Sequence, residues 1–312
     1  MTILIGIPRG TVTAGLAALF VVCWSSGFVG AKLGAQAYDV STVLAWRFLP
    51  LAVVLLLITA LRRDRTRPGR AELLRQSVIG LLSQSGYLLT VYWAIDLGVS
   101  TGTTALVDGT QPLVVAALVG PLLGVAVRGR QRVGLLLGLV AVGAVTWADA
   151  GAPGTHAAPW AYAVPFAGMA CLVAATFLER RSPGPPAPWR NLTIHCTTSA
   201  VVFTLIALVH GTAVPPTEPA FWVATAWLVA FPTFGGYGLY WLLLQRVGIT
   251  TVNSLLFLVP PVTTTWGALW FGEPVTAVTI AGLGLALLAT WLVTAEGGGT
   301  RHRKEVARSG RP

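Results

Sequence analysis

The sequence predicts an all-α polytopic membrane protein, whose ten transmembrane helices form two inverted five-helix repeats. First, 54% of its 312 residues are hydrophobic and only 10% are charged, against about 25% charged in soluble domains. Second, the apolar residues come in blocks of about 20, the length that crosses a hydrocarbon core about 30 Å thick. Third, basic residues gather in alternate loops, and the chain repeats itself at an offset of about 150 residues.

The ten expected spans follow from those apolar blocks, with boundaries good to about 2 to 4 residues. The first block resembles a signal peptide, because Arg9 precedes it and Ala35-Gln36-Ala37 resembles a cleavage site. Its apolar run of about 20 residues exceeds the usual 7 to 15, so we expect an uncleaved first span. The spans lie at approximately 12–31, 43–61, 76–96, 101–124, 133–149, 158–178, 192–211, 220–242, 250–271 and 276–295.

The distribution of Lys and Arg predicts which side of the membrane each loop faces. Alternate loops and both termini carry 19 of the 21 basic residues, whereas the opposite side has only Lys32, and Arg47 lies inside a span. Basic loops stay in the cytoplasm, so both termini are expected there in a multi-pass protein of the cell membrane. The net charge of +10 therefore sets topology and indicates no nucleic-acid partner. The basic cytoplasmic tail, residues 297–312, sets topology or binds anionic membrane lipids.

The two halves of the chain resemble each other, which divides it into residues 1–150, residues 151–296 and the tail. Tyr92-Trp93 recurs as Tyr240-Trp241, and Leu97-Gly98-Val99-Ser100 recurs as Val247-Gly248-Ile249-Thr250. Because each half has five spans, an odd number, the second half must enter the bilayer from the opposite face. Inverted repeats of this kind recur in secondary transporters, whose binding sites lie between the halves near the midplane. Gene duplication without transport is the alternative.

Four short sequence features occur along the chain in a characteristic order. They are Trp24-Ser25-Ser26-Gly27-Phe28; Arg47-Phe48; Gly98-Val99-Ser100 and Gly248-Ile249-Thr250, which lead to Pro112 and Pro261; and Phe271-Gly272-Glu273-Pro274. In this order and spacing they resemble the drug/metabolite transporter superfamily, and within it the ten-span proteins with two EamA-type repeats. The resemblance covers about residues 12 to 295.

The resemblance implies a transporter of a small organic metabolite or drug, with a central cavity lined by spans one to four and six to nine. Spans five and ten then lie outside the cavity, which agrees with their near lack of polar residues. The chain departs from the family pattern where Val127-Arg128-Gly129-Arg130 replaces the first Gly-Glu turn, and where the first span lacks an acidic residue. Gly134 with Gly138, and Gly120 with Gly124, are spaced for close helix packing or for a homodimer.

Two charged residues inside the predicted spans are the first candidates for a substrate-binding site. A charge at the bilayer centre costs at least about 2.5 to 3.5 kcal/mol, so it needs a partner, water or a function. Arg47 lies about 6 Å and Asp108 about 10 Å from the same membrane face, so we expect an ion pair. It would be a gate or a substrate anchor, with Arg47 holding a carboxylate and Asp108 an ammonium or a coupling proton. A static pair that fixes helix packing, or an Arg47 that snorkels to the headgroups, is the alternative.

Six further residues complete the predicted substrate-binding site because they lie on polar or aromatic helix faces. On the fourth span, Thr104, Asp108 and Gln111 share one stripe. Such faces suit a hydrated cavity with aromatic walls, and hydrogen bonds between helices, worth about 0.6 to 2 kcal/mol each, are the alternative. Asp149 is expected to be solvated at an outer span end. His195 is expected to be satisfied or to snorkel near the cytoplasmic end, and titration near neutrality is the alternative. The six are Trp24, Gln84, Tyr87, Gln111, Tyr237 and Asn253.

The sequence favours a secondary transporter that is not an enzyme and that uses no cofactor or metal. It contains no GxxxxGK[ST] loop and no His-Glu-x-x-His motif, and its three cysteines are expected to be small buried hydrophobic residues. The expected function is export of metabolites, amino acids or drugs by alternating access through the central cavity, with a small-molecule substrate and membrane lipids as partners. A membrane-embedded lipid-modifying enzyme or a lipid flippase is the alternative.

Overall fold

Helices make up almost all of the structure, a computed structural model that describes residues 9–61, 68–123, 129–182 and 188–294. Within these ranges there is no strand, so the predicted all-helical fold is confirmed. The predicted tail, residues 297–312, and the segment Val127-Arg128 lie outside them. The first half contains α1 (Arg9–Ala35), α2 (Val40–Leu61), α3 (Arg70–Gly80), η1 (Leu81–Gly86), α4 (Tyr87–Asp96), α5 (Thr101–Gly109), α6 (Gln111–Leu123) and α7 (Gly129–Ala150).

The second half repeats this order of elements. A short 3₁₀ turn precedes α8, and the π-helical segment η3 joins α10 to α11 as η1 joins α3 to α4. Its elements are η2 (Pro159–Ala163), α8 (Val164–Arg180), α9 (Pro188–His210), α10 (Pro219–Leu228), η3 (Val229–Tyr237), α11 (Gly238–Leu255), η4 (Leu256–Leu258), α12 (Val259–Phe271) and α13 (Ala277–Thr294).

Among the described residues, eight helical stretches are long and apolar enough to cross a membrane, and a shorter apolar helix covers Ala277–Val293. The predicted fourth span is not one continuous helix, because α5 ends at Gly109 and α6 begins at Gln111. Pro112 has no backbone N–H and its ring clashes with the carbonyl four residues earlier, which explains the break. In the second half the corresponding region contains η4, followed by Pro260 and Pro261 in the first turn of α12.

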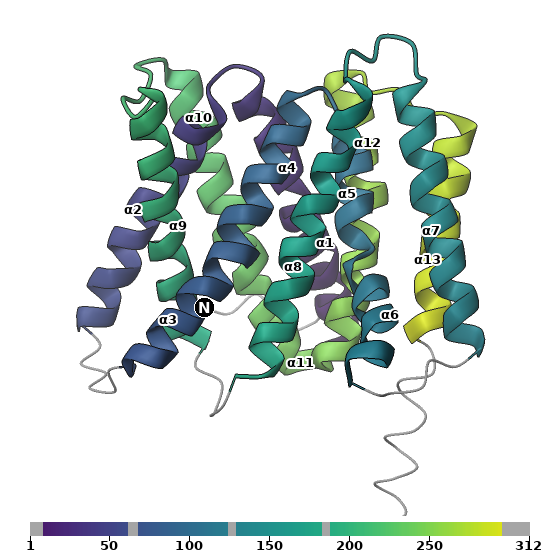
Figure 1. Ribbon diagram of the computed structural model, residues 1–312, viewed down its shortest axis with the longest axis horizontal. Helices are drawn as coiled ribbons and strands as arrows, with labels where there is room; N and C mark the ends of the chain where they lie inside the picture. The colour runs from purple at the N-terminus through teal and green to yellow at the C-terminus, as the bar shows by residue number, and fades with distance from the viewer. Residues whose placement is uncertain (1–8, 62–67, 124–128, 183–187, 295–312) are drawn as a thin grey trace, which may run out of the picture.

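The helices stand side by side, so the bundle has two ends (Figure 1). We call one the Arg180 end, where α2 and α8 end and α3 and α9 begin. The other is the Glu273 end, where α1 and α12 end and α5 begins. The sequence predicts that the Arg180 end, which carries most of the basic residues, faces the cytoplasm.

The internal repeat extends to local backbone irregularities. The π-helical segments η1 and η3 begin 148 residues apart, at Leu81 and Val229. Gly98 lies in the turn between α4 and α5, and Gly248 interrupts α11, whose range contains two helices that meet at a kink there. Both glycines have a positive φ, of 95° and 80°, a conformation that only glycine adopts without strain. Because π-helical segments are rare and often lie at functional sites, their pairing draws attention to the middle of the bundle.

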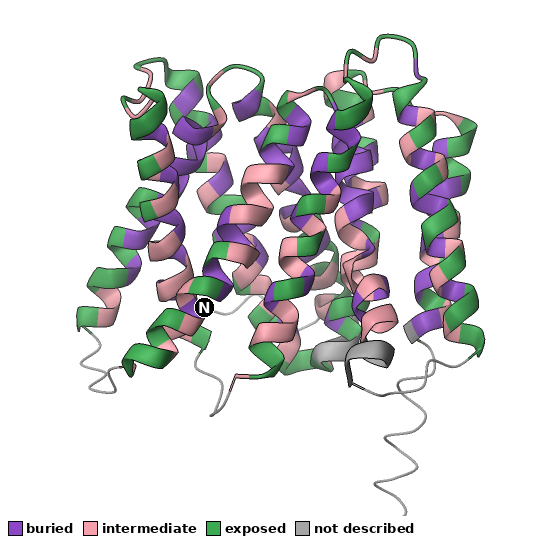
Figure 2. Cartoon of the chain, viewed as in Figure 1, coloured by how far each residue is buried: buried purple, intermediate pink, exposed green. Residues whose placement is uncertain are grey.

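The outer faces of the helices are apolar and exposed. Most of the long helices combine a buried face with an exposed one (Figure 2), and the exposed face carries large hydrophobic side chains such as Leu57, Leu139 and Val209. A soluble monomer rarely exposes a contiguous apolar patch of more than a few hundred Å². These apolar faces are stable in contact with lipid tails and not with water, so the chain is a multi-span membrane protein.

Helices α7 and α13 form a tight pair at one side of the bundle (Figure 1). A Cβ atom added at Gly134 would lie 2.8 Å from the carbonyl oxygen of Ala289, and one at Gly138 would collide with Leu113. The predicted role of these glycines in close helix packing is therefore confirmed within one chain. The second predicted pair, Gly120 with Gly124, extends outside the described residues.

Replacing Gly134 by Ala should lower the melting temperature of the purified protein, because the added methyl group meets the backbone of α13, which cannot turn away. Overpacking of this kind costs about 1 to 3 kcal/mol. Gly143 on the same helix has nothing within 4 Å of the added Cβ. Gly143→Ala should therefore raise the melting temperature slightly, through the higher helix propensity of Ala. Equal effects of the two substitutions would contradict this packing.

At the Glu273 end, the turn before α2 is tied to the turn after α9. The Asp39 carboxylate accepts hydrogen bonds from the backbone N–H of Ser41 at 2.9 Å and from the Thr212 hydroxyl at 3.3 Å. Thr42 donates to the Thr212 carbonyl at 2.6 Å. Partial burial acts to raise the pKa of Asp39, but the hydrogen bonds from Ser41, Thr42 and Thr212 outweigh it and hold that pKa below its ordinary value of 3.8.

Asp39→Ala should lower the melting temperature at neutral pH, since loss of such a helix cap costs about 1 kcal/mol. Because the folded pKa lies below the unfolded one, the stabilisation is present above the unfolded pKa and is lost as the pH falls through the folded value. The melting temperatures of the variant and the original protein should therefore converge under acidic conditions. A difference that persists well below that pKa would show that the carboxylate charge is not its cause.

Candidate functional site

A cavity of about 580 Å³ lies between the two halves of the chain. Its described lining comes from α1 to α6 and from α8, α9, η3, α11, η4 and α12, with no residue of α7 or α13. The expectation that spans five and ten lie outside the cavity is thus confirmed. All eight residues predicted for the substrate site line this one cavity: Trp24, Arg47, Gln84, Tyr87, Asp108, Gln111, Tyr237 and Asn253.

Arg47 is buried, with 5% of its surface exposed, and is held by both halves of the chain. One terminal nitrogen donates to the Tyr92 hydroxyl on α4 at 2.9 Å, and the other donates to the Thr233 hydroxyl on η3 at 3.2 Å. Thr233 in turn donates to the Leu228 carbonyl. The third guanidinium nitrogen, Nε, is buried without a hydrogen-bond partner. Arg47 therefore does not snorkel to the membrane surface, and it lines the cavity with one buried donor unsatisfied.

Asp108 lies near the end of α5 and accepts a hydrogen bond from the Tyr87 hydroxyl at 2.7 Å. The predicted ion pair between Asp108 and Arg47 is wrong. Among the described residues the ion pairs are Lys32 with Glu273 and Glu72 with Arg75. Arg47 and Asp108 are expected at similar depths, but Tyr92 and Thr233 satisfy two guanidinium nitrogens of Arg47.

The amide side chains contact the wall that α8 and α9 form. Gln84 donates to the Cys196 sulfur at 3.8 Å and accepts from the Ser199 hydroxyl at 3.3 Å. Gln111 donates to the Thr176 hydroxyl at 3.0 Å. The predicted stripe on the fourth span is wrong for Thr104, which does not line the cavity but is fully buried and donates to the Ser100 carbonyl. The stripe is also interrupted, since α5 ends before Gln111.

Aromatic rings surround the polar groups of the cavity. Trp24 packs between Phe20 and Tyr237, with ring centroids 5.6 and 5.7 Å away. The hydroxyl-bearing rings of Tyr87, Tyr92 and Tyr240 also line the wall. Such walls present flat apolar area together with a few polar tips, so they favour a solute that is apolar in part.

The cavity extends to the Arg180 end of the bundle. Glu179, near the end of α8, and Asn191, near the start of α9, line it there. The buried amide of Gln76 connects α3 to α8 and α9, since it donates to Glu179 at 3.0 Å and hydrogen-bonds His195 at 2.9 Å. His195 is thus satisfied locally, as expected, although it also lines the cavity.

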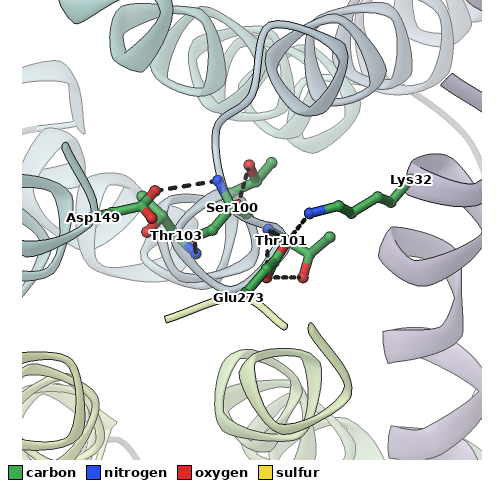
Figure 3. Close-up of polar contacts among 7 residues, drawn as sticks. Lys32, Ser100, Thr101, Thr103, Asp149 and Glu273 are labelled. Carbon is green, nitrogen blue, oxygen red and sulfur yellow. Dashed lines mark hydrogen bonds and ion pairs between the residues drawn. The ribbon is translucent and has the colours of Figure 1, made fainter. Parts of the chain in front are cut away.

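At the Glu273 end, polar contacts join several helices (Figure 3). The Glu273 carboxylate accepts from the Lys32 ammonium at 2.5 Å and from the backbone N–H of Thr101 at 3.0 Å. Asp149 accepts from the neighbouring N–H of Ser100 at 3.1 Å. Asp149 is 7% exposed, so its expected solvation is wrong. The cavity lining includes none of these residues.

Sequence reasoning missed several partners of the predicted residues. Tyr92, Thr176 and Ser199 hold Arg47, Gln111 and Gln84 in place, yet each belongs to a different span from its partner. The recurrence of Tyr92-Trp93 as Tyr240-Trp241 was the available signal for Tyr92. Within the described ranges, no three His, Cys, Asp or Glu side chains are grouped to hold a metal ion, and the three cysteines are free.

Comparison with known proteins places this architecture among transporters. The EamA-like transporter family matches residues 12–147 and, separately, residues 159–295. The chain is 26% identical to the "Probable terminal-alkyne amino-acid exporter" of Streptantibioticus cattleyicolor, over 94% of this chain and 96% of the exporter. It is 25% identical to the "Uncharacterized inner membrane transporter YedA" of Escherichia coli K12, over 89% of each. A solved crystal structure with 19% identity has a TM-score of 0.60 and covers 91% of this chain and 97% of its own, which supports the fold alone.

Proposed function

The chain belongs to the EamA-like transporter family, and we propose that it is a secondary transporter that exports zwitterionic metabolites of the amino-acid class across the cell membrane. In this proposal ten spans form two inverted repeats, both termini are cytoplasmic, and the cavity between the repeats opens to each side in turn. Inverted repeats permit this because the same packing can be arranged in two near-equivalent ways.

One observation carries the proposed substrate class: the cavity holds a cation and an anion that are not paired with each other. Arg47 has a buried Nε without a partner, and Asp108 accepts from the neutral Tyr87. A solute that carries both a carboxylate and an ammonium would complete both sites, since a guanidinium binds carboxylates well and a carboxylate binds an ammonium. The aromatic walls suit an apolar side chain between or beside these two groups.

Size and the named relative agree with this class. A cavity of about 580 Å³ falls within the range of about 300 to 1,000 Å³ that is typical of small-molecule sites. The similar exporter of Streptantibioticus cattleyicolor is named for an amino acid with a terminal alkyne, a solute that combines a zwitterion with an apolar chain. The cavity opens at the Arg180 end, which the basic loops predict to be cytoplasmic, so a solute can enter it from the cytoplasm, as export requires.

Counterflow in sealed liposomes that contain only this protein tests the proposal. Vesicles loaded with an unlabelled apolar amino acid should take up the same labelled amino acid faster than protein-free vesicles. The corresponding amine, which lacks the carboxylate, and the corresponding acid, which lacks the amino group, should compete poorly. Equal competition by all three compounds would contradict the zwitterion, and no protein-dependent exchange of any of them would contradict the transporter of this substrate class.

A further inference from the structure

The Glu273 carboxylate connects three segments that are far apart in the sequence. It lies in the turn after α12, in the second half of the chain, and it accepts from Lys32 at the end of α1, in the first half. It also accepts from the backbone N–H and the hydroxyl of Thr101, the first residue of α5. The side chains of Lys32 and Glu273 are 13% and 8% exposed. Both halves of the transporter are therefore joined here by one partly buried anion.

The helices approach closely at this contact because glycines line it. A Cβ atom on Gly102 of α5 would collide with Thr264 of α12. A Cβ atom on Gly267 of α12 would collide with the Glu273 carboxylate and lie 2.6 Å from the Thr101 hydroxyl. Because Gly267 has no side chain, the Glu273 carboxylate has room to reach the N-terminus of α5. Unpaired N–H groups and the helix dipole favour an anion at that place.

The same helix that Glu273 holds also reaches the substrate cavity. Asp108 lies seven residues after Thr101 on α5, about 10 Å away at 1.5 Å per residue. The cavity extends to the Arg180 end, whereas Lys32, Thr101 and Glu273 do not line it. The Glu273 contact therefore lies between the cavity and the opposite face of the membrane.

From this arrangement we propose that Glu273 is a gating residue, which closes the cavity at the Glu273 end by holding Lys32 and Thr101 and releases both when the cavity opens there. The proposal rests on the proposed alternating access. Polar groups suit a contact that must open in each cycle, because water can replace the lost hydrogen bonds of Lys32, Thr101 and Glu273, whereas separated apolar surfaces would remain exposed to water.

Thiol labelling from outside the cell tests the gate. In a protein whose three cysteines are replaced by Ala, Ser83→Cys places one thiol on the cavity wall, in η1. A membrane-impermeant methanethiosulfonate applied to intact cells should react slowly with this reference protein and quickly in inside-out vesicles. Adding Glu273→Gln should speed the reaction from outside by about tenfold, since a neutral amide accepts hydrogen bonds from Lys32 and Thr101 more weakly than a carboxylate does.

Two further variants separate gating from misfolding. Lys32→Gln removes one of the four contacts and should give a smaller rise in the labelling rate. Gly267→Ala displaces the carboxylate without changing any charge and should also raise it. Glu218→Gln, which removes an exposed carboxylate before α10 at the same end, should leave the rate unchanged.

An unchanged outside rate in both Glu273→Gln and Lys32→Gln, with labelling in inside-out vesicles intact, would overturn the gate. Fast outside labelling of the reference protein, or an equal rise in Glu218→Gln, would overturn it as well. Failure of the proposed function is distinguishable from these results. If the protein exchanged no amino acid in liposomes but Glu273→Gln were labelled faster from outside, the gate would be supported and the proposed substrate class would be contradicted.

Discussion

Arg47→Ala is expected to reduce counterflow of an apolar amino acid by roughly 10- to 150-fold, the equivalent of the 1.5 to 3 kcal/mol that a hydrogen bond to a charged group contributes. The guanidinium is already oriented by Tyr92 and Thr233, so a carboxylate would bind to a preorganised group. The loss should be confined to solutes with a carboxylate. Exchange of the corresponding amine, measured in the same vesicles, should change little.

Two controls define what the Arg47 result means. Arg47→Lys keeps the positive charge but loses the planar fork, and it should recover only part of the exchange. Arg130→Ala removes a cation that lies over the Trp291 ring, on the α7–α13 pair outside the cavity, and should leave exchange unchanged. If Arg47→Ala slowed the amine and the amino acid equally, Arg47 would be a residue that holds α2 to α4 and η3 and would not bind substrate.

The sequence was sufficient for the helical membrane fold and for the list of cavity residues, for a simple physical reason. Burying a polar or charged side chain in lipid is costly, so such residues concentrate on the faces that avoid lipid. Gln84 and Gln111 could be selected on that basis alone, and the structure brings both to the same cavity. The family resemblance implied the peripheral place of α7 and α13, and their near lack of polar residues agrees with the same rule.

Pairing between helices could not be predicted in this way, since it depends on rotations and depths of about an ångström. Arg47 and Asp108 have similar depths, yet their partners are Tyr92, Thr233 and Tyr87. Asp149 was assigned to solvent because it stands at a span end, but the N-terminus of α5 reaches it. In each case the missing information was which helix end or hydroxyl group lies opposite.

The irregular helical segments could not be predicted from the periodicity of apolar residues either. A π-helical segment is defined by i→i+5 hydrogen bonds and requires no particular residue type, so neither η1 nor η3 was predicted from the sequence. Pro112 lies inside the predicted fourth span, where a proline allows bending, and α5 ends three residues before it, at Gly109. Proline thus marks the place of the break, whereas the two glycines with positive φ, Gly98 and Gly248, fix where each following helix starts.

Asp108→Asn is expected to reduce exchange of an apolar amino acid by about tenfold or more, since the amide cannot pair with an ammonium as a carboxylate does. Asparagine has the same shape, and its carbonyl oxygen can still accept the hydrogen bond from Tyr87. The wall of the cavity should therefore keep its geometry. Exchange of the corresponding acid, which has a carboxylate and no amino group, should be unaffected by the variant.

The melting temperature of Asp108→Asn separates a substrate anchor from a structural group. Removing one member of a buried ion pair destabilises a protein by about 3 to 5 kcal/mol, because the other charge is left uncompensated. Asp108 has no cation within ion-pair distance among the described residues, so the variant should melt at the same temperature or higher. Asp96→Asn, at an exposed position at the end of α4, is the matched carboxylate control and should change neither measurement. A lowered melting temperature with unchanged exchange would assign Asp108 to helix packing and remove the ammonium site from the transporter.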